Sequence, residues 1–254
     1  MSALDQSDMG FLVELADRAG AEIMEIYAGD IAVAEKEDRS VVTKADTAAE
    51  AVILAGLAQR FAAIPVVAEE SVAAGKIPEV ADRFFLVDPL DGTREFISRN
   101  GEFTVNIALV ENGVPVAGVV TLPALGIAYW TSGDGTAWRR DKDGTRAVSC
   151  RAVPPEGASV VASRSHRDAE TDAFIATIKV KELVSAGSSL KFCRVAEGSA
   201  DVYPRFGRTM EWDVAAGHAV LAAAGGSVTG ADGSPFRYGK PGWDNRAFIA
   251  RGRG

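Results

Sequence analysis

The residues best placed to do chemistry stand where an apolar run stops. Residues 84–87, Phe-Phe-Leu-Val, lead directly into Asp88, and a second carboxylate, Asp91, follows three residues later. Pro89 cannot donate a hydrogen bond to a neighbouring strand, and Gly92 permits a tight turn. Carboxylates at the end of a buried strand are oxygen ligands of the kind that divalent cations prefer. Because Asp-Pro and Asp-Gly are also ordinary turn dipeptides, the pattern taken alone favours a plain turn.

Two further acidic positions follow the same logic. Glu69 comes directly after the apolar run 64–68, and Asp213 comes directly before the apolar residues 214–224. An aspartate before a helix is most simply its N-cap, which is the alternative to a role as a ligand. If Asp213 is a ligand, we expect it to face the two aspartates above across the junction of two structural units, where pockets commonly form.

The elements that must position these residues change in character along the chain. Residues 7–28 and 46–61 carry apolar side chains at helical spacing, and Thr47 and Glu50 have the spacing of a capping box. That spacing leaves a helix cap as one interpretation of Asp46. Short apolar runs and two hairpin turns then predict an antiparallel sheet, with strands at 64–68, 84–87, 103–110, 114–122, 126–131 and 136–139.

From about residue 150 the pattern alternates between strand and helix. We expect strands near 160–162, 182–185, 201–203, 227 and 247–250, and helices at 167–178, 188–196 and 212–224. This alternation is typical of a layered α/β unit. Two prolines and a glycine between residues 151 and 157 suggest the boundary. We therefore predict an N-terminal α+β unit at 1–152 and a C-terminal α/β unit at 153–254.

Composition excludes several classes of protein. The 254 residues are 47% hydrophobic and 24% charged, as in ordinary globular proteins, with a formal net charge of −8. An acidic chain argues against binding to a nucleic acid polymer, which relies on basic patches. No apolar stretch is long enough to span a membrane, and the N-terminus does not resemble a secretory signal. The default expectation is a cytoplasmic protein, with peripheral association with the inner membrane and a homodimer both left open.

Other catalytic motifs fail on inspection. The glycine-rich nucleotide loops, the GxSxG elbow and the HExxH zinc motif are all absent. Residues 188–191 match SxxK, but its companion SDN and KTG motifs are missing. Cys150 and Cys193 lie far apart, and His166 and His218 lack the spacing of metal ligands. His218 lies in an apolar helix, whereas His166 lies on a polar loop.

Taken together, four separated motifs resemble the magnesium-dependent, lithium-sensitive phosphatases that include the inositol monophosphatases and the bisphosphate nucleotidases. In the order of that superfamily, they are Val-Thr-Lys-Ala-Asp at 42–46, Ala-Glu-Glu-Ser at 68–71, Asp-Pro-Leu-Asp-Gly-Thr at 88–93 and Trp-Asp-Val-Ala-Ala-Gly at 212–217. The resemblance covers nearly the whole chain. It implies a layered α-β-α-β-α sandwich, which agrees with the antiparallel and then alternating pattern of elements.

The resemblance also implies roles for individual residues. Magnesium, as two or three ions, would be bound by Glu69, Asp88, the carbonyl oxygen of Leu90, Asp91 and Asp213. Gly92 and Thr93 would hold the phosphate, and the attacking water would be oriented by Glu69 and Thr93, with Asp46 behind Thr93. This is the multi-metal logic of phosphate ester hydrolysis, in which one ion activates water and another stabilises the leaving oxygen.

Within the superfamily, residues 93–109, 187–193, 201–205 and 210–213 resemble the bacterial 3′(2′),5′-bisphosphate nucleotidases. That likeness implies hydrolysis of adenosine 3′,5′-bisphosphate to AMP and phosphate, in support of sulfate assimilation. The nucleotide contacts it implies are Ser189, Lys191 and Arg205 for the second phosphate and ribose, with His166 near the base. Phe206 replaces the sugar-binding glutamate of inositol monophosphatases. The alternatives are an inositol-1-phosphate or other sugar phosphatase and, more distantly, a metal-binding regulatory module without catalysis.

Overall fold

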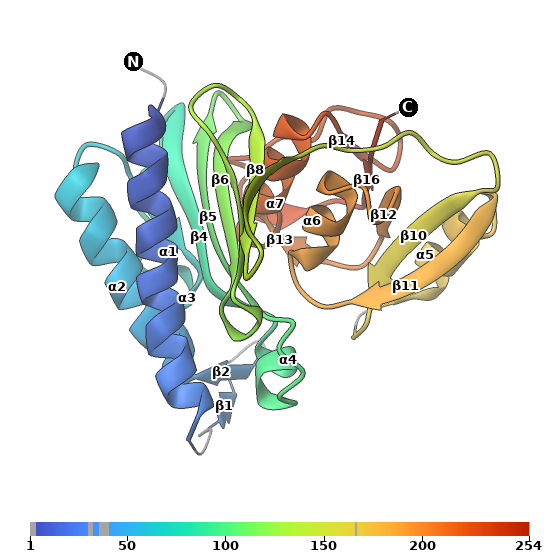
Figure 1. The fold of residues 1–254 in the computed structure, drawn as a ribbon. Helices are drawn as coiled ribbons and strands as arrows, with labels where there is room; N and C mark the ends of the chain where they lie inside the picture. Colours follow the sequence, from blue (N-terminus) through green and yellow to red (C-terminus); the bar gives the residue numbers. More distant parts are fainter. Residues whose placement is uncertain (1–3, 30–32, 36–40, 166, 254) are drawn as a thin grey trace.

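The computed structural model describes residues 4–29, 33–35, 41–165 and 167–253, which fold into five layers. Two helices cover the outer face of a seven-stranded sheet, and two more lie between that sheet and a second, five-stranded sheet (Figure 1). A short helix packs on the far face of the second sheet. The order of layers is therefore α-β-α-β-α, which confirms the expected fold class.

The first sheet contains seven strands in the order of the sequence. Its first two strands are parallel, and every later neighbour is antiparallel. Side chains of the central strands alternate between two apolar clusters, one on each face of the sheet. The strands are β3 (Val66–Ala68), β4 (Arg83–Asp91), β5 (Thr104–Glu111), β6 (Val114–Leu122), β7 (Ile127–Thr131), β8 (Ala137–Asp141) and β9 (Gly144–Val148).

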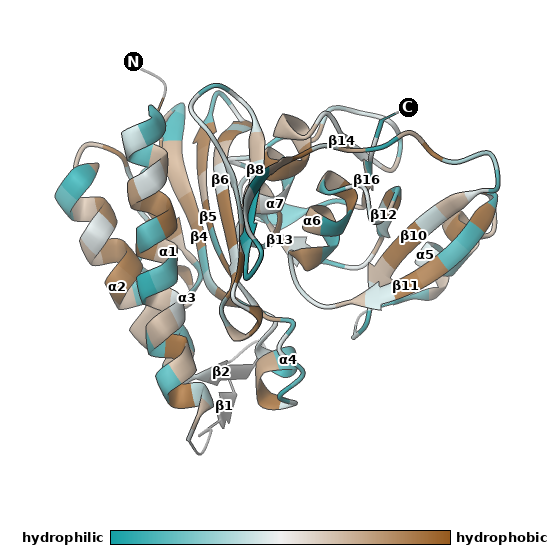
Figure 2. Ribbon diagram, viewed as in Figure 1, coloured by the Kyte–Doolittle hydropathy of each residue, from teal (hydrophilic) through white to brown (hydrophobic). Residues whose placement is uncertain are grey.

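Two long helices, α1 (Gln6–Tyr27) and α2 (Lys44–Arg60), bury their apolar sides on the outer face of this sheet. Hydrophilic and hydrophobic residues alternate along α1, as expected of a helix with one solvated side (Figure 2). The strands β1 (Val33–Glu35) and β2 (Val41–Thr43) form a separate antiparallel pair before α2.

The second sheet is mixed. Its spatial order is β11 (Val180–Ala186), β10 (Ala158–Ser163), β12 (Val202–Arg205), β16 (Phe248–Arg251) and β14 (Ser227–Gly230). Helix α5 (Ala169–Ile175) packs on its outer face. Helices α6 (Leu190–Ala196) and α7 (Glu211–Ala223) lie on its inner face, and α7 also packs against β4, β5 and β6. A helix covered on two sides is apolar almost all round, which explains the near-continuous apolar sequence of α7.

Short elements complete the chain. They are α3 (Glu69–Ala73), α4 (Thr93–Ile97), a 3₁₀ turn (Pro123–Leu125), β13 (Thr209–Met210) and β15 (Asp244–Asn245). The sequence patterns missed β9 and these shortest strands. The division at residue 152 falls between the two sheets and remains a proposal, since one apolar cluster joins both sheets through α6 and α7. Among the described residues, no helix is long and apolar enough to cross a membrane.

Candidate active site

Strand β4 delivers Asp88 and Asp91 into one cavity. Its pairing with β5 is regular up to Asp88 and shifts before Asp91, next to Pro89, which has no N–H to donate. Asp88 is only 1% exposed, and its Oδ1 accepts a hydrogen bond from the Leu90 N–H at 3.0 Å. Gly92 then has a φ of 94°, a left-handed conformation that favours glycine, and turns the chain into α4.

Glu69 lies where strand β3 meets helix α3. It directly follows Ala68, the last residue of β3, as expected from the sequence, and it is the first residue of α3. Glu50 of α2 fixes this turn, because its carboxylate accepts hydrogen bonds from the Glu70 N–H at 2.8 Å and the Ser71 hydroxyl at 2.6 Å. The expected capping box of Thr47 and Glu50 is therefore wrong, and Thr43 and Asp46 form it instead.

Asp213 is the third residue of α7, not its N-cap as the alternative interpretation supposed, because the helix begins earlier, at Glu211. Its Oδ2 accepts a hydrogen bond from the Met210 N–H at 2.8 Å, so it still satisfies a backbone group at the helix start. The Ser189 hydroxyl donates to the Asp213 carbonyl oxygen at 2.6 Å and ties α7 to the start of α6.

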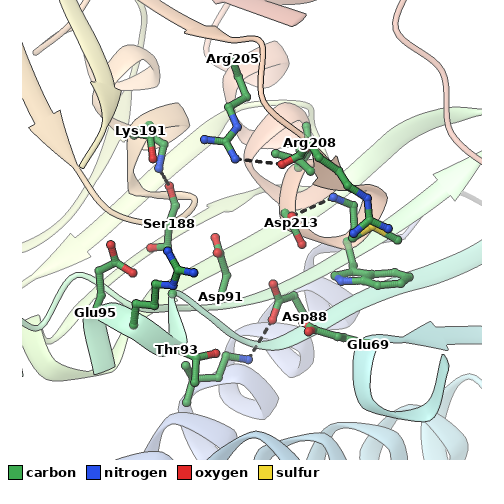
Figure 3. A pocket seen from close by; sticks show the side chains of 18 of the residues that line it. Glu69, Asp88, Asp91, Thr93, Glu95, Ser188, Lys191, Arg205, Arg208 and Asp213 are labelled. Carbon is green, nitrogen blue, oxygen red and sulfur yellow. Dashed lines mark hydrogen bonds between the residues drawn. The ribbon is translucent and has the colours of Figure 1, made fainter. Parts of the chain in front are cut away.

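These elements bring three carboxylates together. Within the part of the chain that the structure describes, Glu69, Asp88 and Asp213 each offer an oxygen, and the three oxygens lie within 4.8 Å of one another. Asp91 lines the same cavity (Figure 3). Burial raises the pKa of Asp88 and of Asp213 well above the ordinary value, and neighbouring carboxylates raise them further. Burial likewise raises the pKa of Asp91 to about 6. Such crowded, buried oxygens fit a divalent cation, whose charge would relieve their repulsion.

Asp46 is the third residue of α2 and not its N-cap, which is Thr43, but it completes the capping box of that helix. Its Oδ2 accepts hydrogen bonds from the Thr43 N–H at 2.7 Å and the Thr43 hydroxyl at 2.8 Å, which forms the capping box of α2. Its Oδ1 lies 3.4 Å from the Thr93 hydroxyl, which donates to it. Burial raises the pKa of Asp46, while the bonds from Thr43 oppose that rise.

The cavity has a volume of about 840 Å³, and the cationic side chains of Lys191 and Arg205 lie on its side away from Glu69 and Asp88 (Figure 3). Lys191, Arg205 and Arg208 line it. Lys191 is 4% exposed and donates from Nζ to the Ser188 carbonyl oxygen at 2.5 Å. Burial lowers the pKa of Lys191 to about 8, and the charge of Asp91 opposes that change. A cavity of this size with both signs of charge suits a small anionic ligand.

The other residues expected to contact the substrate differ in whether they line the cavity. Gly92, Thr93 and Leu90 line the cavity. Arg205 lines it too, while its guanidinium donates to the carbonyl oxygens of Gly207 at 3.1 Å and Arg208 at 2.9 Å. Ser189 is 1% exposed, and its hydroxyl donates to the Asp213 carbonyl oxygen. This geometry favours a role in holding α6 against α7 over a direct contact with a ligand. His166 lies outside the described residues.

Comparison with known proteins decides the family. The model of the inositol monophosphatase family matches residues 5–248. The chain belongs to that family. Two curated relatives in it carry the name 3′(2′),5′-bisphosphate nucleotidase CysQ. The protein from Shigella flexneri is 47% identical over 227 residues, 89% of this chain and 91% of its own. The protein from Escherichia coli K12 is 46% identical over the same shares.

Solved structures of the inositol monophosphatase family agree with this fold. CysQ from Bacteroides thetaiotaomicron superimposes with a TM-score of 0.83 at 38% identity, covering 98% of both chains. The Thermotoga maritima inositol monophosphatase gives a TM-score of 0.81 at 25% identity, covering 96% of this chain and 92% of its own. The family's fold therefore holds over nearly the whole chain.

Sequence patterns missed some residues of this family member's site. Glu50 was a capping candidate but braces the start of α3 instead. Its position four residues after Asp46, on the side of α2 that also buries Ile53, was the available signal. Arg208 lines the cavity and pairs with Asp244 at 2.6 Å, and nothing in the local sequence marked it.

Proposed function

We propose that this protein is a metal-dependent phosphatase that converts adenosine 3′,5′-bisphosphate into AMP and phosphate. The observation that carries the proposal is one cavity that joins a cluster of three carboxylates to a wall of cationic side chains. The carboxylates can bind metal ions that in turn bind the reacting phosphate. The cationic side chains can bind a second phosphate directly. The names of the curated relatives, and the phenylalanine at position 206, support the nucleotide over inositol phosphate as substrate.

The residues that would hold the metal are the three clustered carboxylates together with Asp91 and the carbonyl oxygen of Leu90. We propose Mg²⁺, as two or three ions, because oxygen ligands of this kind suit it. Bound there, Mg²⁺ would supply an acidified water and would neutralise charge that develops on the phosphate and the leaving oxygen.

The chain's own residues would orient the reaction. The Thr93 hydroxyl donates to Asp46, which fixes the direction of its oxygen lone pairs toward the cavity. We propose that Thr93 and Glu69 together accept hydrogen bonds from the attacking water and so hold it in line with the phosphorus. The backbone N–H groups of Gly92 and Thr93 would bind the phosphate oxygens, since both residues line the cavity.

The part of the substrate that is not hydrolysed needs its own contacts. We propose that Lys191 and Arg205 bind the 5′-phosphate and ribose, with His166 near the base. Ser189 would act through Asp213, to whose carbonyl oxygen it donates, rather than on the nucleotide. A cytoplasmic location stays a prediction, and a homodimer remains one of the oligomeric states left open.

Phosphate release from adenosine 3′,5′-bisphosphate tests the proposal. We expect release of phosphate with Mg²⁺, AMP as the nucleotide product and none of the isomeric adenosine 3′-phosphate. Excess chelator should stop the reaction, and Asp213→Asn should stop it without unfolding the protein. Turnover that continues in excess chelator would exclude the metal assignment. Failure of the folded, magnesium-loaded protein to act on the nucleotide would exclude the substrate.

A further inference from the structure

One acidic residue of the cavity has no part in the proposed metal binding or water activation. Glu95 lies on α4, is 4% exposed and lines the cavity. Its Oε1 accepts a hydrogen bond from the Ser165 hydroxyl at 2.6 Å. Burying a carboxylate this deeply costs free energy unless hydrogen-bond donors satisfy it. Within the described residues only Oε1 has a hydrogen-bond donor, so the second oxygen, Oε2, can accept a hydrogen bond from a ligand in the cavity.

Two glycines fix where this carboxylate lies. A Cβ atom placed on Gly92 would meet Glu95 Oε2 at 3.4 Å, and one placed on Gly187 would meet Glu95 Cγ at 2.7 Å. The side chain is therefore wedged between the proposed phosphate cradle and the loop that leads to α6. Figure 3 shows it beside Ser188, on the side of Asp91 away from Glu69. Its charge raises the pKa of both Asp91 and Lys191, so it acts on both halves of the cavity.

A carboxylate in this position selects for a particular chemical group. It repels phosphate, and it can only accept hydrogen bonds. The group that meets it must therefore be a donor attached close to the scissile ester. In a nucleoside 3′,5′-bisphosphate the ribose hydroxyl next to the ester is such a donor. A 2′,5′-bisphosphate offers the 3′-hydroxyl in the same relation, so one acceptor can serve both isomers.

We infer that Glu95 is a substrate-binding residue that accepts a hydrogen bond from the ribose hydroxyl adjacent to the scissile phosphate. This inference rests on the proposed function. It means that Glu95, on α4, recognises the ribose of the substrate. The Ser165 hydroxyl acts as a positioning group, because it holds Oε1 and leaves Oε2 toward the cavity.

The experiment compares adenosine 3′,5′-bisphosphate with its 2′-deoxy analogue, which lacks only the proposed donor. We expect the wild-type protein to prefer the ribonucleotide by roughly 10- to 100-fold in kcat/KM, as for hydrogen bonds to a charged group. Glu95→Ala should lose that preference and bring the ratio close to one. Glu95→Gln keeps a neutral acceptor and should retain part of it. The affinities for AMP and 2′-deoxy-AMP, measured by calorimetry, should change in the same direction.

Glu102→Gln is the matched control. Glu102 is a neighbouring carboxylate that accepts hydrogen bonds from the Gly187 N–H at 2.8 Å and from Arg164 at 2.9 Å, and it does not line the cavity. Its loss should affect both substrates equally and leave the ratio unchanged. An unchanged ratio in Glu95→Ala, or a wild-type ratio near one, would overturn the inference while the nucleotidase proposal stands. A wild-type protein inactive on both nucleotides would overturn both.

Discussion

The Thr93 hydroxyl donates to Asp46 Oδ1 at 3.4 Å, across 47 residues of sequence, and so connects the start of α4 to the start of α2. The other oxygen of Asp46 accepts two hydrogen bonds from Thr43. One buried aspartate thus completes the capping box of a helix and at the same time orients a hydroxyl of the cavity. This relationship ties the stability of α2 to the geometry of the proposed water site.

Thr93→Val tests whether that hydroxyl takes part in the reaction. The substitution keeps the shape and removes the oxygen, so we expect kcat to fall by about 10²-fold or more, because the attacking water is no longer held in line. KM should change little, because the backbone contacts to phosphate remain. Thr93→Ser restores the hydroxyl and should recover most of the rate. A near-normal rate in Thr93→Val with a large loss in Thr93→Ser would mean that the methyl group, and hence packing, is what matters.

Asp213→Asn distinguishes a role of Asp213 as a metal ligand from a role in stabilising the start of α7. Asparagine can still accept the hydrogen bond from the Met210 N–H, so we expect the free energy of unfolding to change by less than about 1 kcal/mol. Turnover at ordinary magnesium concentrations should fall by orders of magnitude, because a charged metal ligand is lost. Steady-state kinetics with denaturant titration measures the two effects. A variant with near-normal turnover would show that Asp213 serves only the helix.

Removing the metal should make stability depend on pH in a defined sense. Burial raises the pKa of Asp91 from 3.8 to about 6, and it also raises the pKa values of Asp88 and Asp213. Between about pH 4 and pH 6 the folded, metal-free protein therefore binds more protons than the unfolded chain. Its free energy of unfolding should fall as pH rises through this window, by up to about 3 kcal/mol from Asp91 alone.

Magnesium should cancel that loss, because a metal ion binds the ionised carboxylates. The gain in melting temperature on adding Mg²⁺ should be small near pH 5 and large near pH 8. Subtracting the melting temperature measured with chelator from that measured with Mg²⁺ at each pH cancels the contribution of distant titrating groups such as His218. Burial lowers the pKa of His218 to about 4, so that residue stabilises the fold as pH rises. A gain independent of pH would contradict the carboxylate site.

Lys191→Ala tests whether Lys191 binds the second phosphate of the substrate. A charge-assisted hydrogen bond is worth about 1.5–3 kcal/mol, which corresponds to roughly 10- to 150-fold in kcat/KM for the bisphosphate. Hydrolysis of a small monoester such as inositol 1-phosphate should barely change. Arg194→Ala is a suitable control, since it removes a charge from the same helix where Arg194 pairs with Glu197 at 2.9 Å.

The competing role of Lys191 is visible in the structure. Its Nζ donates to the carbonyl oxygens of Ser188 and Ala186, so it also supports the loop before α6. A purely structural lysine would lower the rates on both substrates by the same factor. That result would remove Lys191 from the nucleotide site.

Local sequence sufficed for the elements with strong periodicity. The long helices α1, α2 and α7 and the hairpin at Asn112-Gly113 were predicted within a few residues, because an apolar period or a turn dipeptide fixes them. Strand β9 was missed, since its residues are mostly exposed and carry no apolar alternation. Its pairing with β8 supplies what its own sequence does not.

Contacts between distant residues set the limit for the site. The cluster of Glu69, Asp88 and Asp213 was expected from motif resemblance, and the structure brings these residues together. Ser189 was expected on the substrate, but it donates to Asp213 instead, because α6 begins directly beside α7. The role of Glu50 depends on how α2 and α3 meet. Such contacts are settled by tertiary packing, which local patterns do not encode.

The most direct measurement is the ratio of kcat/KM for adenosine 3′,5′-bisphosphate to that for inositol 1-phosphate, at saturating Mg²⁺. Both substrates are phosphate monoesters of a secondary alcohol, and under the proposed binding mode only the nucleotide would have a second phosphate to reach the cationic side chains of the cavity. We predict a ratio of at least roughly 10, and up to about 150, in favour of the nucleotide. A ratio of one or less would contradict the account and favour an inositol or sugar phosphatase.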